Sequence, residues 1–410
     1  QAAGKEKSWS DLDKDVKSKL ESIKANGGNI RILSSTLISP SLKSAITEFS
    51  AVYPSTKLIQ YDTLSASAMI SANQASFGKA VLPTYRFDKA DYVVGIGCDF
   101  MSNWINPVEY SRQYAEKRKL NPKDKNMSKH VQIESILSLT GSNADKRIAL
   151  KPSELGISAL QLLNKLSGSS LSSKSLGAND AAISALASEL NNFTGKALVV
   201  CGINNPAIQQ VVNAINTHLG AYGATIDLDT PDFTRQGNDT AVAELVSELN
   251  AGTVDALFIY NTNPAYTYPG FAAALAKAKL SVYLGDRADE TGANCQMIAP
   301  DHHYLEAWSD SNPRKGIYTL GQPTISPLFK TRQAIESFLT GAGNTTNAHD
   351  YISKYWENNV FSSVGASGLF TAFWNKSLHD GVISGGQATT PVSPNTSTAN
   401  TTANTAATPV

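Results

Sequence analysis

Residues 255–264 read Asp-Ala-Leu-Phe-Ile-Tyr-Asn-Thr-Asn-Pro, an apolar run that ends in polar residues and a proline. The run predicts a buried strand, and Asn263-Pro264 predicts a turn with exposed backbone amides just beyond its carboxyl end. A second apolar run at 281–284 is soon followed by Asp286. In open α/β sheets ligands bind outside the carboxyl ends of the strands. We therefore expect Asn263 and Asp286 to face one crevice.

The same alternation of strand-like and helix-like segments runs through most of the 410 residues. It predicts an α/β protein with two doubly wound, mostly parallel α/β/α units. Pro40 is expected to begin a helix with Leu42 and Phe49 on its apolar face. The prolines within 301–330 predict irregular structure there. The expected bounds are 1–150 for the first unit, 151–345 for the second, 346–383 for helices packing back on the core and 384–410 for a linker.

The segment 384–410 consists mainly of Thr, Ala, Asn, Ser, Pro and Gly. Such a segment has no apolar face to bury, so we expect a disordered, low-complexity connector to further sequence. The chain begins with Gln1 and shows no signal peptide. We expect that a leading segment was removed or lies outside the chain.

The charge balance bears on the class of partner. Lys and Arg number 35, equal to Asp and Glu, so no basic excess favours nucleic acid. The longest apolar run, at 197–203, is far shorter than the ~20 residues of a membrane span. The basic stretch 112–129 is interpreted as a solvated helix end and loop, with a docking patch for an acidic partner as the alternative.

The three cysteines, Cys98, Cys201 and Cys295, are far apart in sequence. Zinc and iron–sulfur sites usually contain a closely spaced pair, so buried free thiols are the expected state. The adjacent His302 and His303 point in opposite directions in extended chain and are expected to anchor a loop. The cysteines and histidines therefore predict no metal site.

The sequence Gly95-Ile96-Gly97 follows an expected strand. A dinucleotide-binding fingerprint requires a third glycine at position 100, where Phe100 stands. We interpret the two glycines as a tight turn at the end of a strand.

The ordered set around Asn263 is similar to the large subunits of the molybdopterin (dimethyl sulfoxide reductase-like) oxidoreductases. In that family a strand and Asn-Pro are followed by a strand ending in Asp, then Glu-Thr, Leu-Pro and Glu. The corresponding residues of this chain are Asn263-Pro264, Asp286, Glu290-Thr291, Ala299-Pro300 and Glu306. The resemblance implies that the two units have the molybdopterin-oxidoreductase architecture.

The chain more closely resembles a divergent branch, the B subunit of bacterial alternative complex III, over roughly residues 9–378. The segments that carry this resemblance are 39–41, 82–88, 90–100, 104–108, 139–145 and 322–328. The resemblance implies a non-catalytic, cofactor-free structural region of a quinol-oxidising respiratory complex that passes electrons to cytochrome c or an oxidase. Iron–sulfur clusters are expected in a neighbouring region of the same subunit.

The resemblance also implies partners and a location. The partners would be multihaem c-type cytochrome subunits, integral membrane quinol subunits and the iron–sulfur region of the same complex, with a terminal oxidase as a further partner. The location would be the periplasmic side of the bacterial inner membrane, peripheral within a membrane complex and reached by a twin-arginine-type route.

Two serines leave open an alternative function within the same family. Active members usually carry a four-cysteine motif and a molybdenum ligand, often Cys, after the second strand; the corresponding loop, 61–67, contains no thiol. Because Ser65 or Ser67 offers an alkoxide ligand, an active molybdopterin oxidoreductase of polysulfide or thiosulfate reductase type stays the alternative. A periplasmic-type small-molecule receptor is a third hypothesis. We expect no catalytic residue, no metal ligand and a vestigial pocket at Ser65, Asn263, Pro264, Asp286 and Thr291.

Overall fold

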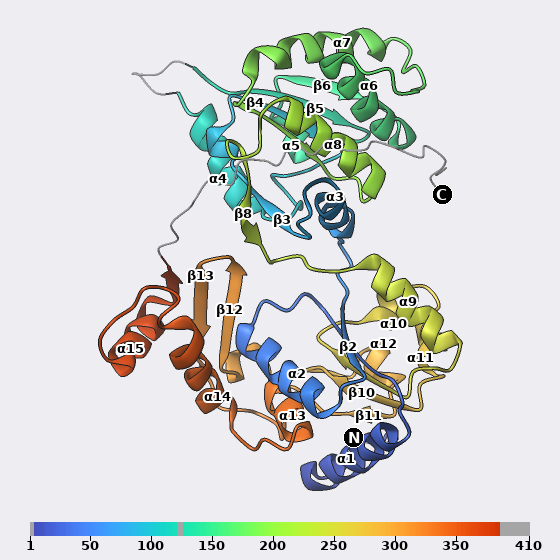
Figure 1. Ribbon diagram of the computed structural model, residues 1–410, viewed down its shortest axis with the longest axis vertical. Coiled ribbons are helices and arrows are strands. Elements are labelled where there is room, and N and C mark those ends of the chain that lie inside the picture. The colour runs from blue at the N-terminus through green and yellow to red at the C-terminus, as the bar shows by residue number, and fades with distance from the viewer. Residues whose placement is uncertain (1–3, 121–125, 386–410) are drawn as a thin grey trace. The chain divides into compact units, whose positions relative to one another are not determined.

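The computed structural model describes residues 4–120 and 126–385 (Figure 1). The described residues form two compact units: unit 1 contains residues 4–65 and 236–385, and unit 2 contains residues 66–235. Most of the expected linker, residues 386–410, lies outside the described residues. No helix in the described part of the chain has the length and apolar character needed to cross a bilayer.

These units differ from the bounds expected from the sequence. The first strand, β1 (Ile30–Ser34), pairs in parallel with β9 (Ala256–Tyr260), so both ends of the chain contribute to one sheet. Similarly, β4 (Tyr92–Ile96) pairs with β7 (Ala197–Cys201) across the expected boundary at residue 150. Apolar runs identify strands, but they do not say which strands pair.

Unit 1 is built on a parallel sheet with the order β11-β10-β9-β1-β2. Its remaining strands are β2 (Thr56–Gln60), β10 (Leu280–Leu284) and β11 (Met297–Ile298). Helices cover both faces, as expected for a doubly wound unit. One face packs on α1 (Trp9–Ala25), α2 (Pro40–Val52) and α13 (Ala334–Gly341), and the other on α9 (Asp239–Asn250) and α11 (Phe271–Leu275).

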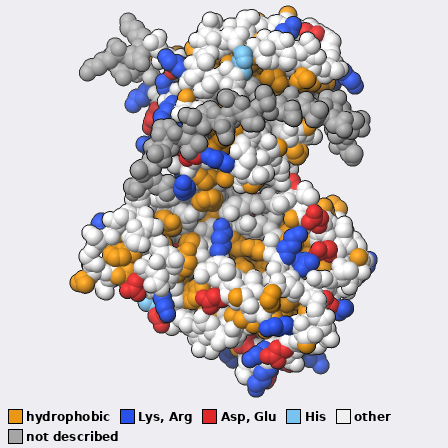
Figure 2. Space-filling model, viewed as in Figure 1, with side chains coloured by type: hydrophobic (Ala, Val, Ile, Leu, Met, Phe, Trp, Pro, Cys, Tyr) orange, Lys and Arg blue, Asp and Glu red, His pale blue; other side chains and the backbone are white. Residues whose placement is uncertain are grey.

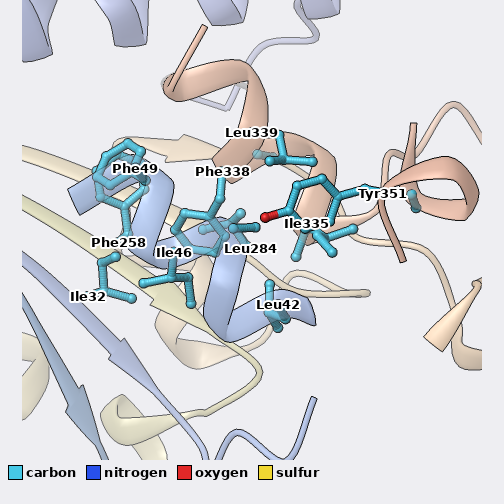
Figure 3. Packing of buried hydrophobic residues seen from close by; sticks show 14 of the residues in the cluster. Ile32, Leu42, Ile46, Phe49, Phe258, Leu284, Ile335, Phe338, Leu339 and Tyr351 are labelled. Atoms are coloured by element: carbon cyan, nitrogen blue, oxygen red, sulfur yellow. The ribbon is translucent and has the colours of Figure 1, made fainter. Parts of the chain in front are cut away.

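The helix α2 begins where the sequence predicted. Pro40 occupies the first turn, and the side chain of Ser39 accepts a hydrogen bond from the amide of Leu42, which caps the helix. Leu42 and Phe49 are buried on its apolar face, and the ring of Phe49 packs against the ring of Phe258 of β9 (Figure 3). Burial of such side chains stabilises the fold by roughly 1.5–3 kcal/mol each.

The segment 301–330, expected to be irregular, contains an antiparallel hairpin of β12 (Ser309–Arg314) and β13 (Ile317–Gly321). The expectation was wrong because Pro313 lies where the register shifts between Ser311 and Arg314, and a bulge tolerates proline within a strand. The other elements of unit 1 are α10 (Pro264–Thr267), α12 (Glu290–Ala293), η4 (Tyr304–Glu306), α14 (Ala348–Tyr355), the π-helix η5 (Trp356–Val360), α15 (Phe370–Asp380) and β14 (Val382–Ser384).

Unit 2 contains a second parallel sheet, in the order β6-β5-β4-β7. Its central strand β4 is buried on both faces, between two apolar clusters. A separate antiparallel pair joins β3 (Leu82–Tyr85) to β8 (Ile226–Asp232). The other elements are β5 (Lys129–Glu134), β6 (Lys146–Ala149), α3 (Ser67–Phe77), η1 (Phe87–Lys89), α4 (Pro107–Arg118), α5 (Leu139–Ser142), η2 (Pro152–Glu154), α6 (Leu155–Ser167), α7 (Asn179–Leu190), η3 (Asn191–Phe193) and α8 (Pro206–His218).

Charged side chains of both signs are interspersed on the face seen in Figure 2. In the basic stretch, Lys117 and Arg118 form ion pairs with Asp91 and Asp145 at 2.8 and 2.6 Å. Two basic side chains of the stretch are thus paired within unit 2. Residues 121–125 of the stretch lie outside the described part of the chain.

Candidate functional site

A crevice lies at the carboxyl edge of the unit 1 sheet. The chain runs from β1 to β2 on one side, whereas β9 and β10 lie on the other, so this edge is a topological switch point. The crevice encloses a cavity of about 530 Å³. Its lining includes Ser39, Asn261, Asn263, Asp286, Asp301 and Trp308. The structure therefore brings Asn263 and Asp286 to one crevice, as the sequence predicted.

The Asn-Pro turn is fixed by Thr291. The Asn263 side-chain oxygen accepts hydrogen bonds from the Thr291 hydroxyl (2.7 Å) and amide (3.2 Å), and the Asn263 amide group donates to Glu290 at 2.6 Å. The amide of Ala265 donates to the Thr291 hydroxyl at 3.0 Å. This amide is thus bonded within the protein, whereas the sequence predicted exposed amides. Thr291 is fully buried, and Pro264 is buried at the start of α10.

Asp286 lies on the exposed side of the crevice. Its carboxylate accepts two hydrogen bonds from Arg287, at 2.9 and 2.8 Å, and this pairing lowers the pKa of Asp286. Asp286 is therefore ionised at neutral pH. The ion pair is exposed, so water and salt screen it and it contributes little to stability.

Asp301 is a crevice residue that was not among the candidate site residues predicted from the sequence. It is half-buried in the cavity wall, and its carboxylate accepts hydrogen bonds from the amides of His302 (2.9 Å) and Ala334 (2.8 Å). Burial raises the pKa of Asp301 to about 7, and the nearby charge of Asp286 adds to this effect. The sequence feature that could have identified Asp301 is its position just after β11, which is equivalent to the position of Asp286 after β10.

The loop of residues 301–306 is held by its own side chains. His302 shares a hydrogen bond of 2.5 Å with the hydroxyl of Thr331, and the ring of His303 accepts one from the amide of Leu305 at 3.3 Å. The buried Glu306 accepts from the amides of His303 and Leu328, at 3.2 and 3.0 Å. The two histidines thus anchor a loop, as expected.

The candidate ligand Ser65 does not line this cavity. Ser65 is half-buried at the end of the first segment of unit 1, whereas Ser67 is buried at the start of α3 in unit 2. Burial raises the pKa of the Cys201 and Cys295 thiols to about 12, and the pKa of Cys98 also rises. Metal ligation by cysteine needs the thiolate, which this burial disfavours. Across residues 4–120 and 126–385, no group of three or more His, Cys, Asp or Glu residues is placed to hold a metal ion.

The carboxyl edge of the unit 2 sheet is arranged differently. Gly97, with a φ of 55°, follows β4, and Gly202 follows β7. A Cβ atom at Gly202 would lie 2.1 Å from the carbonyl oxygen of Gly97. Within β4, a Cβ atom at Gly95 would lie 2.0 Å from the Gln132 side chain. These glycines allow close packing of loops and side chains, which supports the interpretation of a strand-end turn.

No family model and no curated protein matches the chain. Among solved structures, it is similar to acetylene hydratase from Pelobacter acetylenicus, with a TM-score of 0.67, 12% identity, and coverage of 93% of this chain and 64% of that chain. It is also similar to the formyltransferase/hydrolase complex from Methylorubrum extorquens in complex with methylofuran, with a TM-score of 0.55, 12% identity, and coverage of 86% and 99%. The chain thus spans less than two thirds of the hydratase chain. At this identity the likeness concerns the fold alone, a mixed α/β fold with parallel sheets.

Proposed function

We propose that this chain is a non-catalytic, cofactor-free structural region of a quinol-oxidising respiratory complex of the alternative complex III type, built on the molybdopterin-oxidoreductase architecture. The observation that carries the proposal is the bonding of the Asn-Pro turn. Asn263 and Thr291 bond to each other and to the backbone, so these motif residues stabilise the crevice edge. A ligand would have to break bonds whose loss leaves buried groups unsatisfied.

The donor set does not fit a molybdenum centre. The loop 61–67 offers no thiol, and Ser65, the candidate ligand within unit 1, does not line the crevice cavity. The nearest thiol in sequence, Cys98, is buried in the apolar core of unit 2. We therefore assign no chemical step to such a centre in this chain.

An exposed apolar segment supports a role in assembly. Leu328 and Phe329 are 72% and 78% exposed. Their segment is nevertheless fixed, because the amide of Thr324 donates to Leu305 at 2.7 Å and the amide of Leu328 donates to Glu306 at 3.0 Å. Fixed, exposed apolar side chains are typical of surfaces that contact another protein. In this proposal the partners are the multihaem c-type cytochrome, quinol and iron–sulfur components, on the periplasmic side of the membrane.

One observation, the size of the crevice cavity, favours the alternative function, an active molybdopterin oxidoreductase of polysulfide or thiosulfate reductase type. Its volume of about 530 Å³ is within the range of small-molecule sites. The two functions differ in metal content. The protein should be purified from its native membranes and analysed for molybdenum, tungsten and pterin. We expect none at stoichiometric level, together with co-purifying c-type haem; stoichiometric metal or pterin would establish the alternative.

The assembly role has its own test. Leu328→Asp together with Phe329→Asp should reduce co-purifying haem by about tenfold, because the charges oppose burial at an interface. The control is Leu369→Asp, a change at an equally exposed leucine of unit 1. Equal haem yields for the two variants would exclude this segment as an interface.

A further inference from the structure

The crevice cavity of unit 1 contains a second group of polar residues, apart from the Asn-Pro turn. They are Tyr260 at the end of β9, Asp301 after β11 and Gln333 directly before α13. Most of the residues that line this cavity are half-buried or exposed, so the space is open to solvent and is not filled by the core of the unit. This polar group is therefore accessible to a dissolved molecule.

The carboxylate of Asp301 uses only one of its two oxygens. Its Oδ1 atom accepts the hydrogen bonds from the amides of His302 (2.9 Å) and Ala334 (2.8 Å). In the described part of the chain, the Oδ2 atom has no hydrogen-bond partner, and no lysine or arginine forms an ion pair with this carboxylate. Burial raises the pKa of Asp301 to about 7, and the negative charges of Asp286 and Glu336 add to this effect. The cavity thus contains a carboxylate that no cationic side chain pairs with.

Two further polar groups line the cavity close to Asp301. Gln333 is only 8% exposed and precedes Ala334, whose amide binds Asp301, yet its own side-chain amide bonds to none of the described residues. The hydroxyl of Tyr260 also lacks a partner among the residues that the structure describes. The charge of Asp301 contributes to raising the pKa of Tyr260, because the two groups are near each other. Buried polar groups usually have a partner, which here has to come from water or a ligand.

The charges and the donor count select the class of ligand. Asp286 is paired with Arg287, so the unpaired charge of this group is that of Asp301. The oxygens of Asp301, Gln333 and Tyr260 equal in number the three N–H donors of a primary ammonium group. A guanidinium fits less well, because it binds a carboxylate through two parallel hydrogen bonds and the Oδ1 atom of Asp301 is already bonded. An anion would be repelled by the same carboxylate.

Apolar side chains line another part of the same cavity. Leu42, Leu284 and Ile335, which are labelled in Figure 3, belong to this lining. The half-buried Trp308 also lines the cavity, and its indole is stacked on that of Trp374, with ring centres 6.5 Å apart. Aromatic rings pack favourably against other rings and attract cations. The lining therefore suits an amine that carries an apolar, aromatic group.

We propose that the crevice binds a primary amine with an aromatic substituent. Its ammonium group lies at Asp301, Gln333 and Tyr260, and its ring lies against the indole and the aliphatic side chains. The cavity volume of about 530 Å³ is within the range of small-molecule sites. This inference is independent of the proposed function, because the residues of the Asn-Pro turn, whose bonding carries that function, take no part in binding the amine.

The first test compares three ligands of similar shape on the full chain. The chain is titrated calorimetrically at about pH 8, where Asp301 is mainly ionised, with 2-phenylethylamine, the neutral 2-phenylethanol and the anionic 3-phenylpropionate. The amine should bind at least about tenfold more tightly than either comparison ligand, because only the amine pairs with the carboxylate. Absence of saturable amine binding, or equal or tighter binding of the alcohol or the acid, would overturn the proposal.

The second test removes the charge. Asp301→Asn keeps a side-chain oxygen for the amides of His302 and Ala334, so the loop retains its hydrogen bonds. It should weaken binding of the amine by at least about tenfold and leave binding of the alcohol unchanged. The control is Glu357→Gln, at an exposed carboxylate of unit 1 that does not line the cavity. Equal amine affinities of the two variants would contradict recognition by Asp301.

The third test uses a variant that removes no hydrogen bond made within the described chain. Tyr260→Phe deletes only the unpartnered hydroxyl, so denaturant unfolding should show unchanged stability. Binding of the amine should nevertheless weaken by about three- to tenfold, because one hydrogen bond to the ammonium group is lost. A Tyr260→Phe protein of unchanged stability that binds the amine as tightly as the unmodified chain would contradict the proposed position of the ammonium group.

Discussion

The two parallel sheets of the molecule have comparable switch points, but the loops that follow the strands are packed differently at the two edges. In unit 1 the loops after β1, β9 and β10 surround about 530 Å³. In unit 2 the loops after β4 and β7 touch, with Gly202 against the backbone of Gly97. The comparison teaches that sheet topology offers a ligand site but does not create one. The side chains and glycines of the loops decide whether the space stays open.

The largest expected effect comes from forcing the unit 2 edge apart. Gly202→Ala should lower the free energy of unfolding by about 3 kcal/mol, because the new Cβ meets a backbone oxygen that cannot rotate away. Gly156→Ala in α6 is the matched control, since its Cβ meets only the flexible end of Ile208. Denaturant unfolding measures both changes. If the two variants lost equal stability, the close contact between Gly202 and the backbone of Gly97 would not be important for the stability of unit 2.

A smaller effect is expected at the open edge of unit 1. Thr291→Val keeps the shape of the side chain but removes the hydroxyl that bonds Asn263 and Ala265. We expect a loss of about 1–3 kcal/mol, because buried polar groups are left without partners. Thr291→Ser should retain most of the stability. Denaturant unfolding of the two variants side by side measures the difference, and an equally stable Thr291→Val protein would show that the turn does not depend on this hydroxyl.

The smallest change between neighbouring conditions should be the pH dependence of the crevice, at most about 1.4 kcal/mol for each pH unit. The pKa of Asp301 is raised to about 7, whereas an unfolded Asp titrates near about 3.9. Between these values the folded chain binds more protons than the unfolded chain, so this group makes the free energy of unfolding fall as pH rises. Asp301→Asn should remove that slope.

A related variant in the same crevice tests the coupling of the two carboxylates. The pKa of Asp286 is lowered by Arg287, so Asp286→Asn should remove a rise of stability with pH below the unfolded pKa of Asp. Because the charge of Asp286 raises the pKa of Asp301, the same variant should also shift the slope due to Asp301 to lower pH. Unfolding at a series of pH values measures both variants. Parallel profiles for Asp301→Asn and the unmodified chain would show that Asp301 is normally hydrated in the cavity.

The local features of the fold could be predicted from the sequence, whereas the pairing of segments far apart in the sequence could not. The strand at 256–260, the start of α2 at Pro40 and the meeting of Asn263 with Asp286 were predictable, because they depend on short apolar runs, capping residues and the edge rule for parallel sheets. The division into units was not predictable, because it depends on the pairing of β1 with β9. The hairpin at Pro313 was hidden by a bulge. Asp301 was missed because β11, which precedes it, has only two residues.

The discontinuity of unit 1 has a consequence for the order of events during synthesis. Unit 2 is encoded by one continuous stretch, residues 66–235, so all of its described strands and helices leave the ribosome together. The strands β1 and β2 are synthesised earlier, but β1 cannot pair with β9 until the whole of unit 2 has also been synthesised. Until then their apolar faces lack a partner and depend on chaperones or transient contacts. Unit 2 can thus finish folding before the sheet of unit 1 is complete.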